Sequence, residues 1–358
     1  MHLSHKNSLR PSVIFLTGFL VACFGLLAIY DASIVDAFRT FTDRFHYVKQ
    51  QASWLVIGTV ISLITARIPT TWLKKFAPIF LAITVFFLLL VLIPGIGSKF
   101  LGARRWLVLG PVVFQPSELL KITLVIYLSH WLEKEREIKH FLGLIGLLAI
   151  LIMLQPDLGT AIIVVGVSFL LYYLSGAKIR DLGFFSLILL SATTILIVST
   201  PYRLNRVKTF LDPTTDTLGK SYHINQVIYG LGSGGWGGVG LGQSRQKYAF
   251  LPEATTDSIF VIIAEEFGFI GSSLLIVTLV VLIRSSLQVA QLVTEKFDKL
   301  LASGISLLFL IQIFVNLGSM VALIPLTGVP LPFISYGGSS LVSNFIALGL
   351  LINISKKT

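Results

Sequence analysis

Residues 76–94 read FAPIFLAITVFFLLLVLIP, and no charged side chain interrupts them. A helix of this length spans roughly 30 Å, the thickness of the hydrocarbon core of a bilayer. Lipid offers no hydrogen bonds to an exposed backbone, so a segment that crosses it must satisfy its own backbone groups, as a helix does. This stretch therefore predicts a transmembrane helix.

Similar apolar segments recur along the whole chain. We expect ten transmembrane helices, near residues 12–30, 52–68, 76–94, 117–132, 141–155, 160–175, 182–199, 258–283, 301–324 and 340–354. The chain of 358 residues is 54% hydrophobic and 13% charged, whereas soluble domains carry about 25% charged residues. The mean hydropathy of +0.86 agrees with that deficit. The predicted fold class is an all-α integral membrane protein, a ten-helix bundle in one domain over residues 1–358.

The charge distribution predicts how the chain lies in the membrane. The formal net charge is +11. Basic clusters fall on one side of ten crossings, at residues 74–75, 134–136, 178–180, 296–299 and 356–357. The positive-inside rule makes that side cytoplasmic and places both termini there, with the first apolar segment retained as a helix rather than removed as a signal peptide. Orientation and contact with anionic membrane lipids explain the basic excess without a nucleic-acid partner.

The largest interruption of the apolar pattern covers residues 200–257, between the seventh and eighth expected helices. We expect a large extracytoplasmic loop here. Its aromatic content argues against plain disorder, and residues 223–229 are expected to form a short helix over the mouth of the bundle. Basic residues on the same outer side, among them Arg105 and Arg206, indicate an anionic ligand such as phosphate or pyrophosphate.

Glu118 and Lys121 are ionisable residues within an expected membrane span, where charge is costly and marks functional candidates. They are three residues apart, so they share a helix face. Either the pair serves a ligand, or it is an ion pair that only allows the helix to insert. Asp157, in the turn before the next helix but one, either caps that helix or orients Lys121 or a bound cation.

Asp257 ends the large loop and heads the eighth expected helix. Its carboxylate is either an N-cap, a role equally open to Thr256, or a general base toward a hydroxyl group. Residues 330–340 contain two prolines and paired glycines, which form an anion-binding nest or a rigid turn. The histidines show no metal-ligand spacing, and the G-x-G-x-x-G match at 230–235 lacks the preceding strand of a nucleotide site.

Six short motifs follow one another in the order found in the SEDS family (shape, elongation, division and sporulation), which includes FtsW, RodA and SpoVE. The motifs are Gly102–Trp106, Gln115–Glu118, Gln155–Thr160, Leu251–Asp257, Ala264–Gly268 and Pro330–Ser340. From about residue 100 to its end the chain resembles this family. The glycine-rich stretch at 232–244 is closer to the FtsW and SpoVE branch than to RodA.

The resemblance implies a bacterial peptidoglycan glycosyltransferase that polymerises lipid II at the outer face of the cytoplasmic membrane, for cell division or cell shape. The family's essential aspartate falls on Asp257, which is the implied catalytic residue. The family motif reads His-Thr-Asp-Phe, whereas this chain has Thr255, Thr256, Asp257 and Ser258. A role for the histidine therefore does not carry over.

The expected site combines the ionisable residues described above with the chemistry that this resemblance implies. The residues expected to bind lipid II, or to position the groups that bind it, are Lys121, Glu118, Asp157, Arg105, Trp106, Arg206, Ser335 and Tyr336. A class B penicillin-binding transpeptidase is the implied partner, and a divalent cation (Mg or Mn) at the pyrophosphate is left open. Two other functions are left open. A lipid II flippase would move lipid without chain growth, and a non-enzymatic scaffold would tolerate Asp257 substitutions.

Overall fold

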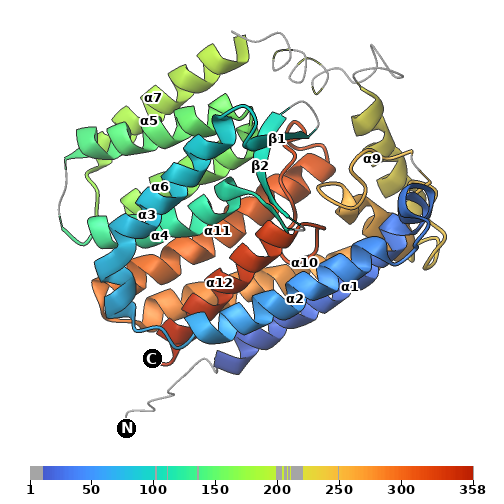
Figure 1. Ribbon diagram of the computed structural model, residues 1–358, viewed down its shortest axis with the longest axis horizontal. Coiled ribbons are helices and arrows are strands. Elements are labelled where there is room, and N and C mark those ends of the chain that lie inside the picture. Colours follow the sequence, from blue (N-terminus) through green and yellow to red (C-terminus); the bar gives the residue numbers. More distant parts are fainter. Residues whose placement is uncertain are drawn as a thin grey trace.

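Helices dominate the computed structural model (Figure 1), which describes residues 11–100, 103–110, 112–134, 137–198, 204, 208, 210, 221–248 and 250–357. The helices are α1 (Pro11–Phe41), α2 (His46–Thr65), α3 (Thr70–Leu92), α4 (Pro116–Trp131), α5 (Ile138–Leu154), α6 (Leu158–Leu174), α7 (Ile179–Val198), α9 (Tyr222–Gly234), α10 (Ile259–Leu292), α11 (Lys296–Met320) and α12 (Gly338–Ser355). The long helices lie side by side and form one bundle.

Each of the ten apolar segments expected from the sequence coincides with one of these helices, and the short helix expected near 223–229 is α9. Five helices are long and apolar enough to cross a membrane, namely α1, α3, α10, α11 and α12, while α5 and α6 are apolar but shorter. An all-α membrane protein is therefore confirmed. The number of crossings stays a prediction.

The bundle has a buried centre and an apolar outer surface. α12 packs against α2, and α11 packs against α10 and α6, so that α11 and α12 lie inside the bundle (Figure 1). By contrast, α2 exposes Val56 (65%) and Val60 (51%), and α3 exposes Phe86 (56%). Continuous apolar surface of this kind is unfavourable in water, and it suits contact with lipid.

α10 is bent at Gly268, where the backbone leaves helical geometry (φ 64°, ψ −164°). A Cβ atom on Gly268 would lie 2.3 Å from the backbone nitrogen of Gly238. Both the positive φ and this close approach require glycine. The bend brings the loop that follows α9 against the helix, because Phe269 N–H donates to the Gly235 carbonyl.

A three-stranded antiparallel sheet was not expected from the sequence. It consists of β1 (Gly97–Phe100), β2 (Ala103–Leu109) and β3 (Val112–Phe114), in that order. Leu107 pairs with Phe114 and Val108 with Val113. The signal was a short apolar run on each side of Gly110, Leu-Val-Leu at 107–109 and Val-Val-Phe at 112–114. The φ of Gly110 is +63°. The signal was missed because the surrounding chain reads as membrane helix.

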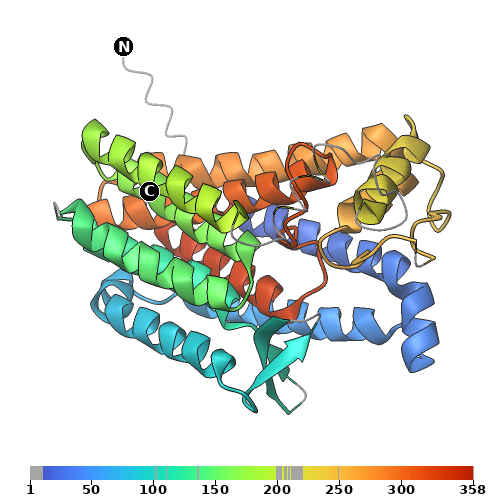
Figure 2. The ribbon, with the colours of Figure 1, turned by 90° about the horizontal axis from the view of Figure 1, so that it is seen from above.

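The two ends of the bundle differ in character. The sheet and α9 lie toward the end away from the C-terminus (Figure 2). At the C-terminal end, Lys356 donates to the Ala66 carbonyl and Lys357 pairs with Asp298. Basic residues therefore gather where α2 and α12 end, and the irregular segments gather where α10 and α12 begin.

Candidate active site

Asp257 lies directly before α10, half-buried in the turn that leads into the helix. Its Oδ1 lies 2.9 Å from the Thr256 hydroxyl. Its carboxylate faces the backbone of Gly328, where a Cβ atom would lie 3.6 Å from Oδ2. The N-cap residue of α10 is Ser258 rather than Asp257 or Thr256. The N-cap position of α10 is thus taken by neither Asp257 nor Thr256, and the Asp257 carboxylate lies near the positive end of the helix dipole.

The segment 327–337 forms one wall beside Asp257. The Ser335 hydroxyl donates to the Thr256 carbonyl at 2.5 Å, and Tyr336 N–H donates to the Thr255 carbonyl at 2.9 Å. Phe333 in this segment has a φ of +66°, a strained conformation for a large side chain. Such strain persists only where the surroundings hold the chain.

From α2, Gln51 holds the other side of segment 327–337. Its Nε2 donates to the Ser335 carbonyl at 3.2 Å, and its Oε1 accepts from Gly337 N–H at 3.1 Å. The Tyr336 hydroxyl donates to Gln50 Oε1. Burial raises the pKa of the Tyr336 phenol further above its ordinary value.

Two amide side chains on α11, neither predicted from the sequence, connect the parts of the site. Asn316 Nδ2 donates to the Asp257 carbonyl at 2.8 Å and to the Val329 carbonyl at 2.7 Å. Gln312 Nε2 donates to the Pro330 carbonyl at 3.0 Å. The two residues are four apart and so lie on one helix face. Two amides at that spacing in an apolar helix were the available signal.

Glu118 and Lys121 form the predicted ion pair. The Lys121 Nζ to Glu118 Oε2 distance is 2.8 Å, and both side chains are almost completely buried. Lys121 also donates to Gln312 Oε1 at 3.0 Å. Gln312 thus joins Lys121 to segment 327–337. Asn316 in turn joins the same segment to the backbone of Asp257.

The turn between α5 and α6 contains Asp157 and is contacted by Arg105. Both carboxylate oxygens of Asp157 accept from Thr160, the Oδ1 from its N–H at 3.1 Å and the Oδ2 from its hydroxyl at 2.9 Å. Asp157 is therefore the N-cap of α6. Arg105 Nε donates to the Gln155 carbonyl at 3.0 Å, and its guanidinium also reaches the Pro156 carbonyl. A substrate role for either residue stays a prediction.

Trp106 and Arg206 complete the predicted set. Trp106 lies on β2, paired with Ser98 of β1 and half-buried. Arg206 lies outside the described residues. Among the described residues, no group of three or more His, Cys, Asp or Glu side chains could hold a metal ion.

A second buried charge cluster joins α10 to α1 and to the loop after α9. Lys247 contacts Asp31 at 2.8 Å and Glu266 at 3.2 Å. Glu265 accepts from Ser244 and from the backbone N–H of Arg245. Burial opposes the charge of Lys247, but hydrogen bonds and charges from its two acidic partners raise its pKa above the ordinary value. This cluster fixes the loop that leads to Asp257.

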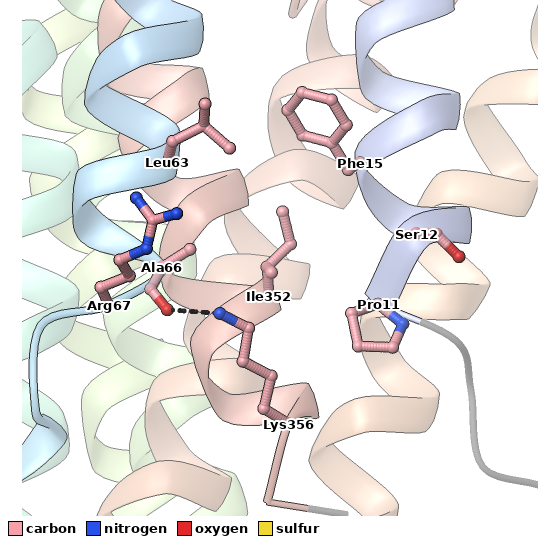
Figure 3. Close-up of a pocket in the computed structure, with 8 residues that line it drawn as sticks. All are labelled: Pro11, Ser12, Phe15, Leu63, Ala66, Arg67, Ile352 and Lys356. Atoms are coloured by element: carbon pink, nitrogen blue, oxygen red, sulfur yellow. Dashed lines mark hydrogen bonds between the residues drawn. The ribbon is translucent and has the colours of Figure 1, made fainter.

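A groove of about 230 Å³ lies at the other end of the bundle (Figure 3). It is lined by Pro11, Ser12, Phe15, Leu63, Ala66, Arg67, Ile352 and Lys356. α2 and α12 separate it from Asp257, since Gln51 near the start of α2 contacts Ser335 whereas Leu63 near its end lines the groove. The groove is therefore separate from the candidate site.

Known proteins resemble this chain over nearly its whole length. The profile of the FtsW/RodA/SpoVE family, described as cell cycle protein, matches residues 11–358. The chain belongs to the FtsW/RodA/SpoVE family. The stage V sporulation protein E of Bacillus subtilis is 38% identical over 94% of each chain. The probable peptidoglycan glycosyltransferase FtsW of a Geobacter species (strain M18) is 35% identical over 96% of each chain.

Solved structures share the fold of this FtsW/RodA/SpoVE family member. A chain from a study of polymerization and crosslinking by a peptidoglycan synthase complex superposes with a TM-score of 0.78, at 28% identity over 96% of this chain and 97% of the other. The rod shape determining protein RodA of Thermus thermophilus has a TM-score of 0.71 at 26% identity, over 98% of each chain. SpoVE and FtsW relatives are thus more similar in sequence than this RodA, as the glycine-rich stretch predicted.

Proposed function

We propose that this chain is a peptidoglycan glycosyltransferase that polymerises lipid II at the outer face of the bacterial cytoplasmic membrane, in cell division or cell shape. One observation carries the proposal. A half-buried carboxylate, Asp257, stands at the start of α10, and Asn316 links its backbone to the segment that Gln312 connects to Lys121. The FtsW relatives, which are named as probable peptidoglycan glycosyltransferases, support the same activity.

The reaction joins two lipid-linked saccharides. The 4-hydroxyl oxygen of one lipid II attacks the anomeric carbon of another chain, and the bond from that carbon to the lipid pyrophosphate breaks. Asp257 accepts the proton of the attacking hydroxyl, and the pyrophosphate leaves with the bonding electron pair. General base catalysis of this kind contributes about 10²–10⁴-fold.

The leaving pyrophosphate needs cationic or N–H partners. Lys121 is buried, and Glu118 neutralises its charge. Its role is therefore to order segment 327–337 through Gln312 rather than to contact a ligand from solvent. The Arg105 guanidinium has more N–H donors than its two carbonyl partners use. Arg105 is therefore the better candidate for a direct pyrophosphate contact.

The membrane arrangement belongs to the same proposal. Ten helices cross the membrane, with both termini on the cytoplasmic side, and the segment 200–257 lies outside. The basic ends of α2 and α12 support this orientation by the positive-inside rule. Asp257 then lies at the outer end of α10, where lipid II with an outward-facing headgroup is accessible.

A class B penicillin-binding transpeptidase is the proposed partner, together with the surrounding membrane lipids. Its support is the structural similarity to a chain from a peptidoglycan synthase complex that couples polymerization to crosslinking. Such a pairing places chain growth and crosslinking at one membrane surface.

The test is the Asp257→Asn variant, which keeps the side-chain shape and removes its basicity. We expect lipid II polymerisation by the purified protein to fall by about 10²–10⁴-fold. Asp43→Asn, an exposed carboxylate paired with Lys49, is the matched control and should polymerise normally. Wild-type chain growth by Asp257→Asn would refute the assignment. Transbilayer movement of labelled lipid II without chain growth would establish the flippase instead.

A further inference from the structure

A histidine from the outer loop contacts the residue that follows Asp257. His223 lies in the first turn of α9, and its Nε2 is 2.9 Å from the Ser258 hydroxyl. Ser258 is completely buried, whereas His223 is half-buried. The imidazole is therefore hydrogen-bonded to a serine that has no direct access to solvent.

The Ser258 hydroxyl is not used in the way that its position predicts. Ser258 is the N-cap residue of α10, yet its side chain makes no capping hydrogen bond. Serine at an N-cap usually accepts from a backbone N–H of the first turn. Here the hydroxyl meets the His223 ring instead, and departures from a local rule of this kind are concentrated at functional sites.

The position of the imidazole is set by close packing of α9 on α10. A Cβ atom on Gly230 would lie 2.5 Å from Val261, and one on Gly234 would lie 2.2 Å from the Ala264 carbonyl oxygen. The Ser233 hydroxyl also donates to Glu265 at 3.2 Å. This close approach packs α9 tightly against α10 and places the His223 ring beside Ser258.

We propose that His223 is a positioning residue for Asp257. By holding the side chain of Ser258, it keeps the adjoining turn in place, so that the carboxylate stays aimed at the acceptor hydroxyl. Asn316 and Ser335 anchor residues 256–257 from the inside of the bundle, and His223 anchors the next residue from the outer loop. The inference rests on the proposed function of Asp257.

The test measures kcat and KM for lipid II polymerisation, with the melting temperature, in four variants. These are His223→Phe, His223→Gln, Ser258→Ala and the double variant His223→Phe/Ser258→Ala. We expect His223→Phe to lower kcat by about 10- to 100-fold at unchanged KM and melting temperature, because a small misplacement of a catalytic group has effects of this size. The Gln amide still reaches the hydroxyl, so His223→Gln should stay within about threefold of wild type.

The double variant tests the contact itself. If His223 acts through Ser258, the kcat of the double variant should equal that of the more impaired single variant. The effects of two substitutions that remove the same contact do not add. Tyr229→Phe removes a polar group from an exposed position of the same helix (61% exposed) and is the control. Ser258→Ala deletes one oxygen atom and keeps the test valid if the phenylalanine variant does not fold.

Three results would overturn the inference: wild-type kcat in His223→Phe and Ser258→Ala, fully additive losses in the double variant, or a loss that follows the melting temperature and is not restored by Gln. The failure of the proposed function looks different. An active Asp257→Asn would remove that function, whereas an inactive Asp257→Asn with a fully active His223→Phe removes only the positioning role.

Discussion

The Glu118→Gln substitution isolates the buried charge of Lys121. The variant keeps the shape of the side chain and leaves the ammonium facing two neutral amides, that of the new glutamine and that of Gln312. At the observed 2.8 Å, the Coulomb attraction is about 6 kcal/mol for an effective dielectric constant of about 20. Desolvation of the two ions offsets most of that gain in the wild type.

Removing one partner is a different matter, because the desolvation cost of the remaining ion stays. Breaking a buried pair in this way typically costs about 3–5 kcal/mol, and the interior of the bundle around Lys121 gives the ammonium little alternative solvation. We therefore expect Glu118→Gln to shift the unfolding equilibrium by more than about 100-fold. Reversible unfolding in mixed detergent micelles measures this shift directly.

The double variant Glu118→Gln/Lys121→Met separates stability from catalysis. It removes both charges, so its stability should return to within about 1 kcal/mol of wild type. If Lys121 serves the pyrophosphate or orders segment 327–337, the restored protein should still polymerise lipid II poorly. Asp43→Asn breaks an exposed ion pair of the same length, and screening by water should leave its stability unchanged. Wild-type stability of Glu118→Gln, or a double variant as unstable as the single one, would refute this reasoning.

Two further substitutions test the local geometry. Asp157→Ala should lower the free energy of unfolding by about 1 kcal/mol through loss of the α6 N-cap, as measured by the same unfolding assay. A tenfold fall in kcat at unchanged stability would instead show a direct substrate role. Gly268→Ala should prevent accumulation of folded protein, because its Cβ would overlap Gly238 at a positive φ, while Gly183→Ala on α7, with no atom within 4 Å of its Cβ, is the control. Normal yield and melting temperature of Gly268→Ala would contradict the required bend.

Several features could be predicted from the sequence because they are local. Apolar length alone places the helices, and a spacing of three residues puts Glu118 beside Lys121 on one helix face. Asp157 caps the helix that starts immediately after it. Each of these depends on neighbours within one helical turn, so hydropathy and spacing are sufficient to find them.

Contacts between distant parts of the chain are decided by the tertiary structure. Asn316 reaches Asp257 from 59 residues away, His223 reaches Ser258 across 35, and Lys247 reaches Asp31 across 216. No periodicity in the sequence encodes these pairs, because each depends on how rigid helices pack and on where Gly230, Gly234 and Gly268 allow backbones to approach. The sequence alone determined a membrane bundle with a carboxylate at one helix end; packing decided which side chains hold that carboxylate in place.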